Sequence, residues 1–208
     1  MSETKDRPYH HGDLRRALID TALAMLALDQ NWAFTLREVA RRTGVSHAAP
    51  YKHFRDKGVL LRELARIGFV QLGDAMTAAL SSDISSMRGK FVAAALACID
   101  FALHNPGLYH LMFSSDADKT ADRQLHDAAM NTFGILLRFL EEAQRSGSFR
   151  SVPVSAQAAA CWAQVHGLAM LALNRQLLEE KVGNEPVQAA LDVLLDGLCR
   201  GEWDRTRV

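Results

Sequence analysis

The 208-residue sequence has only three cysteines, and no two of them stand at C-x-x-C spacing. Cys98, Cys161 and Cys199 lie far apart in apolar, helical contexts, so we expect buried thiols in a reducing cytoplasm. The sequence also lacks a glycine-rich phosphate loop and a triad of metal ligands, so we expect no cofactor and no metal site. These absences argue against an enzyme. A small-molecule enzyme built on Asp100, His104 and His166 would have neither a nucleophile nor a cofactor site.

The sequence has no net charge, because 24 Lys and Arg residues balance 24 Asp and Glu residues. The charges are nevertheless unevenly distributed. Residues 1–66 contain 12 basic and 8 acidic residues, and the segment from Thr35 to Arg62 contains 7 basic and 2 acidic ones. A basic N-terminal part suggests a polyanionic partner for that end of the chain. On charge alone, a solvated basic face explains the distribution equally well.

Charged residues are absent from Ser151 to Asn174, which raises the question of a membrane span. The segment contains Pro153, Gln157 and His166, and so many polar groups do not suit a hydrocarbon environment. We therefore expect burial inside protein and no membrane partner. The polar N-terminus MSETKDRPYHHGD is unlike a signal peptide, which is consistent with a cytoplasmic protein.

Strand-like alternation, internal repeats and low-complexity tracts are absent, and helical periodicity dominates. The sequence predicts an all-α fold with a flexible leader at residues 1–12, a helix-turn-helix domain at 13–56 and a helical C-terminal domain at 57–208. Ser155 is the expected N-cap of a helix that reaches about Glu180. The helices are expected at about 13–28, 35–43, 46–54, 57–80, 87–104, 121–145, 155–180 and 187–199, with a short helical turn at LYHLMF.

The segment from Thr35 to Phe54 has the signals of two short helices joined by a tight turn. Thr35 and Glu38 fit a capping box, and Gly44 is suited to the positive φ that ends a helix. Ser46 is the expected N-cap of the second helix, in which Pro50 would be the fourth residue. Two such helices packed on a longer first helix form a helix-turn-helix motif.

The histidines of this second helix favour DNA recognition over metal binding or catalysis. His47 and His53 are six residues apart, roughly 120° around a helix, and no third ligand is near. On a helix, Pro50 and Phe54 would face inward and Ala48 and Lys52 outward. Small and cationic outward residues suit the major groove. Thr35 and Arg37, at the start of the preceding helix, would meet the DNA backbone.

The stretch TLREVARRTGVSHAAPYKHFRDKGVLLRELA closely resembles the DNA-binding domain of the TetR/AcrR transcriptional regulators. The resemblance covers about residues 8–66. In CWAQVHGLAMLAL, the residues Trp162, His166 and Gly167 are similar to the W-x-x-x-H-G pattern of a C-terminal domain type in one subset of that family. One departure is Pro50, where many members have leucine, and it leaves open which bases the helix reaches.

The resemblance implies an all-α homodimer that binds a double-stranded operator. It also implies a C-terminal ligand pocket, and a dimer interface formed by the last two long helices. Carried over by position, it assigns ten residues to the recognition helix or to phosphate contacts: Thr35, Arg37, Ser46, His47, Ala48, Ala49, Tyr51, Lys52, His53 and Lys57.

Seven residues are candidates for a small-molecule site that would be largely apolar: Asp100, His104, Tyr109, Met112, Phe113, Trp162 and His166. Asp100 and His104 are more simply explained as a helix-end ion pair. Trp162 and His166 could line the pocket or the dimer interface. The sequence therefore predicts a dimeric repressor released by a small-molecule effector, without excluding activation. The alternative is a constitutive DNA-binding regulator with no effector.

Overall fold

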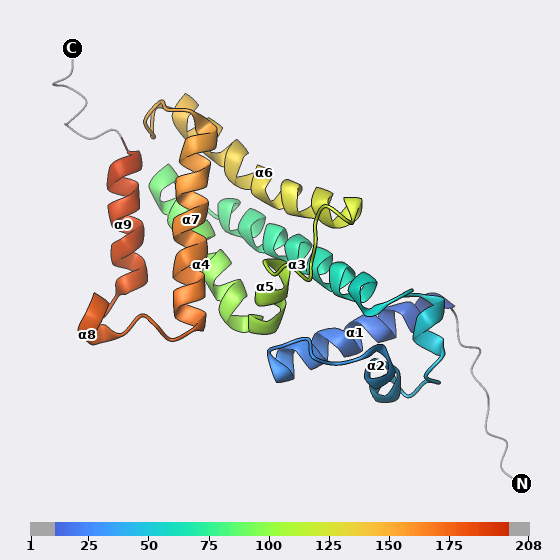
Figure 1. Cartoon of the computed structure of the whole chain (residues 1–208). Coiled ribbons are helices and arrows are strands. Elements are labelled where there is room, and N and C mark those ends of the chain that lie inside the picture. The colour runs from blue at the N-terminus through green and yellow to red at the C-terminus, as the bar shows by residue number, and fades with distance from the viewer. Residues whose placement is uncertain (1–10, 200–208) are drawn as a thin grey trace, which may run out of the picture. The chain divides into compact units, whose positions relative to one another are not determined.

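The computed structural model describes residues 11–199, so nearly all of the leader predicted at 1–12 lies outside the described residues. Within the described part the chain is helical, with only an isolated bridge between Phe149 and Cys199 in place of strands. The all-α prediction is confirmed. The elements are α1 (His11–Asp29), α2 (Leu36–Thr43), the 3₁₀ helix η1 (Ala49–Lys52), α3 (Lys57–Leu80), α4 (Met87–His104), α5 (Pro106–Met112), α6 (Arg123–Arg145), α7 (Val154–Leu173), α8 (Glu179–Val182) and α9 (Pro186–Leu198) (Figure 1).

The chain forms two compact units, which we call the N-terminal unit and the C-terminal unit. The N-terminal unit contains the described residues up to Ile67 together with Gly107–Leu125. The C-terminal unit contains Gly68–Pro106 and the described residues from His126 onward. Helix α5 and the loop after it therefore belong with the helix-turn-helix, although they are distant in sequence. The functional boundary expected near residue 57 stays a prediction.

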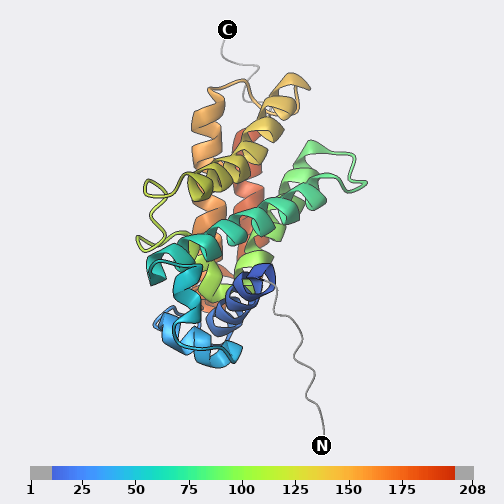
Figure 2. The ribbon, with the colours of Figure 1, turned by 90° about the vertical axis from the view of Figure 1, so that its right-hand side faces the viewer.

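The N-terminal unit is held together by the apolar faces of its helices. Helix α1 buries Leu18, Ala22 and Leu26 at a spacing of four residues, so that they form one stripe. Helix α2 packs on α1 (Figure 2) and buries Leu36, Val39 and Ala40. Full burial of a leucine side chain contributes about 1.5–3 kcal/mol, so a few such contacts account for much of the stability of a small unit.

Helix α5 approaches the end of α1 very closely at Gly107. A Cβ atom at this position would lie 2.5 Å from the carbonyl oxygen of Leu26 and 3.1 Å from the Cα of Gln30. Only glycine allows this approach of backbone to backbone. Tyr109 and Met112 of α5 are buried in the same unit, and the ring of Tyr109 lies 4.9 Å from that of Phe113.

The C-terminal unit is built around α4 and α7, which pack on each other, and α9 runs back alongside α7 (Figure 1). Phe91, Phe139 and Phe149 form an aromatic cluster with ring centroids 6.0–6.4 Å apart. The hydroxyl of Thr132 on α6 donates to the carbonyl of Phe69 on α3 at 2.8 Å. These contacts join helices from distant parts of the sequence into one core.

Helix α9 is also tied to α4 by an arginine. The guanidinium of Arg88 donates to the carboxylates of Asp192 and Asp196, each at 2.8 Å. The hydrogen bonds from Gln188 and Arg88 lower the pKa of Asp192. The pairs are solvent-exposed, so their contribution to stability is small, and they mainly fix the position of α9.

Several helix ends agree with the sequence prediction, and α7 does not. Helices α3 and α4 have the predicted bounds. Helix α7 begins at Val154 with Pro153 as its N-cap, so the prediction of a Ser155 cap is wrong. It ends at Leu173 rather than near Glu180, because the chain turns at Asn174 and Arg175 takes a positive φ of 53°.

No single helix among residues 11–199 is long and apolar enough to cross a membrane. Only α4 and α5 taken together, as a bent pair, reach the required length and composition. Both helices bury apolar side chains inside the protein, among them Phe91 and Ile99 of α4 and Leu111 of α5.

Candidate DNA-binding surface

The first short helix of the motif has the predicted caps. The amide of Glu38 donates to the hydroxyl oxygen of Thr35 at 3.2 Å, and the amide of Thr35 donates to the Glu38 carboxylate at 2.7 Å. Hydrogen bonds from Thr35 lower the pKa of Glu38. At the other end, Gly44 has a φ of 78° and the amide of Val45 bonds the carbonyl of Ala40. The capping box and the glycine turn are therefore both confirmed.

The second short helix differs from the prediction in length and type. It is one 3₁₀ turn, Ala49–Lys52, with Ala48 as its N-cap and no side-chain cap, so the N-cap role of Ser46 is wrong. Pro50 is the second helical residue rather than the fourth. The reason is local, because proline has no N–H and Pro50 cannot donate the i→i+4 bond to the carbonyl of Ser46 that would begin an α-helix there. The amides of Ala49 and His53 form i→i+3 bonds to Ser46 and Pro50.

The inward and outward sides of this turn agree with the prediction. Pro50 and Phe54 are buried, and Phe54 is only 1% exposed. On the opposite side Tyr51 is 50% exposed, and Lys52 is exposed beside it. The preceding turn leaves three further candidates exposed to solvent: Ser46, His47 and Ala48. Ala49 is half-buried. A small, polar and cationic surface is thus formed by one short segment.

Three predicted contact residues have a polar group that is either engaged by another residue or buried within the protein. The hydroxyl of Thr35 also donates to Glu38, at 3.0 Å. The ammonium of Lys57 lies 5.5 Å from the centroid of the Phe34 ring. The Nε2 atom of His53 is buried and has no hydrogen-bond partner among residues 11–199. A DNA contact by His53 must therefore use its other ring nitrogen.

Apart from Lys57, the basic residues from Thr35 to Arg62 divide into two groups. Arg55 pairs with Asp56 at 3.1 Å, and Arg62 pairs with Asp122 at 3.8 Å and is mostly buried. The remaining arginines and Lys52 are exposed and form no ion pair within the described residues: Arg37, Arg41, Arg42 and Lys52. Arg41 and Arg42 belong to the basic segment of the sequence but are not among the ten contact residues predicted from it. Their exposure beside Arg37 on α2 adds them to the candidate surface.

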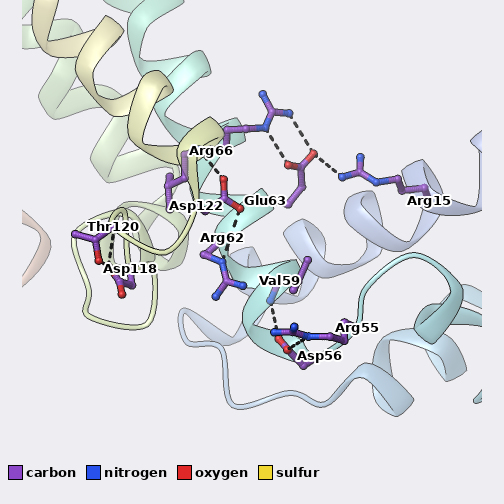
Figure 3. A network of polar contacts seen from close by, with 11 residues as sticks. Arg15, Arg55, Asp56, Val59, Arg62, Glu63, Arg66, Asp118, Thr120 and Asp122 are labelled. Atoms are coloured by element: carbon purple, nitrogen blue, oxygen red, sulfur yellow. Dashed lines mark hydrogen bonds and ion pairs between the residues drawn. The ribbon is translucent and has the colours of Figure 1, made fainter.

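The start of α3 is fixed by a polar network (Figure 3). The carboxylate of Asp56 accepts the amide of Val59 at 2.9 Å and so caps α3. This hydrogen bond, followed by the one from Arg55, lowers the pKa of Asp56. Asp122 accepts the amide of Leu125 at 3.0 Å and caps α6 in the same way. Because Arg62 pairs with Asp122, the caps of two helices are held in one network.

Glu63 joins α3 to α1 in the same network (Figure 3). Its carboxylate accepts hydrogen bonds from Arg66 at 2.9 and 3.1 Å and pairs with Arg15 of α1 at 3.1 Å. The Glu63 side chain is only 11% exposed. The hydrogen bond from Arg66, helped by the charges of Arg66 and Arg15 and opposed by burial, lowers the pKa of Glu63.

We expect Glu63→Gln to reduce the acid sensitivity of the protein. A carboxyl group whose pKa is lower in the folded state stabilises the fold above its unfolded pKa, near 4.3, and this contribution is lost as the pH falls. The free energy of unfolding of the variant should be about 1 kcal/mol below that of the wild type at pH 7. The difference should shrink as the pH falls through the pKa of Glu63 in the unfolded state. Urea unfolding at pH 7 and at pH 4 measures this. An equal loss at both pH values would contradict the role of the charge.

Asp100 and His104 lie on the surface of α4 and do not form the expected ion pair. The Nδ1 atom of His104 donates to the backbone carbonyl of Asp100 at 2.7 Å, and both residues are exposed. A histidine in the last turn of a helix satisfies a free carbonyl there. The prediction of a carboxylate–imidazole pair is wrong, and the assignment of both residues to a pocket stays a prediction.

The other ligand candidates lie in different units. Tyr109, Met112 and Phe113 belong to the N-terminal unit, whereas Trp162 and His166 belong to the C-terminal unit. The Trp162 ring is 6.0 Å from Phe133 and 6.2 Å from His166. Burial lowers the pKa of His166, and Trp162 remains 49% exposed. The two roles considered for Trp162 and His166, in a pocket or in a dimer interface, both stay predictions.

A capped helix, a glycine turn and a second short helix with an exposed polar and cationic face define the helix-turn-helix class of DNA-binding proteins. Comparisons with known proteins agree. Residues 18–64 match the model of bacterial regulatory proteins of the tetR family. Residues 91–198 match the model of the tetracyclin repressor-like C-terminal domain. The chain belongs to the TetR family of transcription regulators, whose members bind DNA and form dimers, and it is not an enzyme.

Solved structures show the same fold. A protein of unknown function from Rhodococcus sp. RHA1 is 36% identical, with a TM-score of 0.81 over 94% of this chain and 100% of that one. A TetR family transcription regulator from Marinobacter aquaeolei VT8 is 18% identical, with a TM-score of 0.65 over 90% and 96% of the two chains. The TetR family regulator PfmR from Thermus thermophilus is also 18% identical, with a TM-score of 0.64 over 88% and 99%.

Proposed function

We propose that the protein is a dimeric repressor that acts in the cytoplasm and binds a near-palindromic operator. Each protomer inserts η1 and the turn before it into a major groove, so that the two copies meet successive grooves about 34 Å apart. The observation that carries the proposal is the exposed group of His47, Ala48, Tyr51 and Lys52 beside the exposed arginines of α2.

The proposed contacts differ in what they recognise. His47 and Ala48 precede η1 on the exposed side, where a small side chain permits close approach to base edges and to a thymine methyl group. Arg37 and Lys52 meet phosphates, as does the ammonium of Lys57 once it turns away from Phe34. Phosphate contacts supply affinity that depends on salt, and base contacts supply sequence preference.

The proposed dimer interface is formed by the exposed faces of α7 and α9. Helix α7 carries no charged residue, and its exposed residues include Trp162 and Leu171 as well as four alanines: Ala156, Ala159, Ala160 and Ala163. On α9, Val193 is 74% exposed. A Cβ atom added at Gly167 of α7 would have no neighbour within 4 Å. An uncharged face with small side chains allows two copies of the helix pair to approach closely.

Binding of DNA from the region beside the protein's own gene tests the operator proposal. We expect salt-sensitive binding with a preference of at least about a thousandfold over unrelated DNA. Tyr51→Ala and Lys57→Ala should each weaken binding by about tenfold while the protein stays folded, because Tyr51 is half-exposed and Lys57 is only partly buried. Fluorescence anisotropy with a labelled duplex measures this.

Two outcomes of this experiment would contradict the proposal. Binding without sequence preference would show that the protein recognises no specific operator. Unchanged affinity in both variants would show that η1 is not the surface that contacts DNA. Arg145→Ala, which removes an exposed cation from the end of α6, serves as the matched control and should leave the affinity within about twofold.

The effector part of the proposal rests on the C-terminal domain that the family model matches at residues 91–198. A small molecule bound there releases the operator only if it binds the DNA-free state more tightly than the DNA-bound state. Operator affinity measured across a panel of small apolar compounds tests this. A panel in which no compound changes the affinity would instead favour a constitutive regulator.

A further inference from the structure

A cavity of about 570 Å³ opens on the N-terminal unit. Residues from three separate parts of the chain line it: the loop after α1, the first turns of α3 and the loop after α5. The lining residues are Asn31, Trp32, Ala33, Lys57, Gly58, Leu61 and Asp116. None of them is among the seven residues considered for the effector site. The cavity therefore raises a separate question about what it binds.

The wall of the cavity is held by hydrogen bonds. The indole Nε1 of Trp32 donates to the carboxylate of Asp116 at 2.7 Å, which joins two loops that are 84 residues apart in sequence. The side chain of Asn31 accepts the amide of Ala33 and donates to the carbonyl of Asp29, each at 2.9 Å. Two loops that are fixed in this way form a site whose shape exists before a ligand binds.

The cavity combines an apolar surface with two opposite charges. The buried Leu61 and the indole-bearing Trp32 are both among the residues that line it. Lys57 contributes an ammonium group that lies 5.5 Å from the centroid of the Phe34 ring. Asp116 contributes a carboxylate, which forms no ion pair within the described residues. Lys57 and Asp116 therefore remain available to a ligand.

We propose that this cavity binds a small zwitterion with an aromatic body, the class to which aromatic amino acids belong. The ligand carboxylate pairs with Lys57, its ammonium group pairs with Asp116, and its ring packs against Trp32 and Leu61. A ligand with one charge would leave the second group of the cavity unpaired. If Lys57 also contacts DNA phosphates, as the proposed function states, a ligand bound in the cavity competes with the operator for the ammonium group of Lys57.

Isothermal titration calorimetry with three probes and no DNA tests the proposal. L-Phenylalanine carries both charges, its methyl ester lacks the carboxylate, and N-acetyl-L-phenylalanine lacks the ammonium group. We expect each modified probe to bind about fivefold more weakly than phenylalanine, which corresponds to the loss of one exposed charge pair. Lys57→Gln should abolish the difference between phenylalanine and the ester. Asp116→Asn should abolish the difference between phenylalanine and the N-acetyl derivative.

Ala33→Trp provides the blocking variant, because Ala33 is exposed and lines the cavity. It should remove binding of all three probes, whereas Lys181→Gln, which changes an exposed lysine of α8 outside the cavity, should leave binding unchanged. No binding of phenylalanine up to about 10 mM overturns the proposal, and so does equal binding by wild type and Ala33→Trp. Since the titration contains no DNA, its failure is distinguishable from a failure of the repressor function.

Discussion

Ala163→Glu is expected to convert the protein into a monomer and to weaken operator binding by about a hundredfold or more. Ala163 lies on the exposed, uncharged face of α7, among the other exposed alanines of that helix. In a twofold-symmetric interface the substitution occurs twice, so each carboxylate would be buried without a cationic partner. Operator affinity falls when the dimer is lost, because two linked half-sites bind far more tightly than either one alone.

Analytical ultracentrifugation and anisotropy with the operator duplex measure the two effects. Ala78→Glu is the matched control, since it places the same charge on an exposed alanine of α3 in the C-terminal unit. It should remain a dimer and bind the operator normally. A dimer of unchanged stability in Ala163→Glu would show that the two copies meet elsewhere.

Gly167→Ala is expected to have opposite effects on the stability of the dimer and on the stability of the protomer. The added methyl group has open space around it in the protomer, and alanine favours a helix over glycine by about 0.5–1 kcal/mol. In the monomeric Ala163→Glu background the substitution should therefore stabilise the fold, as measured by urea unfolding. In the wild-type background it should weaken the dimer, because the methyl group occupies the space needed by the partner helix. A tighter dimer would contradict this.

Phe54→Ala is expected to destabilise the protein by about 3–5 kcal/mol, a large part of the stability of a typical domain. Phe54 is almost fully buried next to η1, and the guanidinium of Arg15 lies 5.5 Å from its ring centroid. Removal of the ring leaves a cavity beneath the turn that presents His47 and Ala48. The turn would then lose part of the support that the core of the N-terminal unit gives it.

Urea unfolding followed by circular dichroism measures this loss. Tyr51→Ala is the control, because it removes a half-exposed aromatic ring three residues earlier and should change the stability by no more than about 0.5 kcal/mol. If Phe54→Ala cost no more than Tyr51→Ala, the turn would be held by its backbone hydrogen bonds rather than by the core.

The features that the sequence predicted best are those with local causes. The Thr35–Glu38 capping box and the turn at Gly44 depend on residues within one or two helical turns. The ends of α3 and α4 likewise follow from their own flanking residues. The error at η1 is also local in origin, because Pro50 lacks the N–H that would donate to the carbonyl of Ser46 in an α-helix, and the Ser46 side chain forms no cap.

The features that could not be predicted depend on contacts between distant residues. Arg62 was counted in the positive charge of the segment from Thr35 to Arg62, yet it pairs with Asp122, which is 60 positions away. The bond between Trp32 and Asp116, which shapes the proposed ligand cavity, spans 84 positions. Helical periodicity predicts which face of a helix is buried, but not which distant segment covers that face.

The close approach of α5 to α1 at Gly107 limits where this protein can be cut and recombined with its relatives. A hybrid regulator joined near residue 67 would combine the helix-turn-helix of one protein with the α5 of another. The foreign segment would need glycine where Leu26 and Gln30 approach, and side chains equivalent to Leu108 and Leu111 to fill the same core. Exchange of the DNA-binding segment between this protein and a relative therefore requires that residues 107–125 be transferred with it.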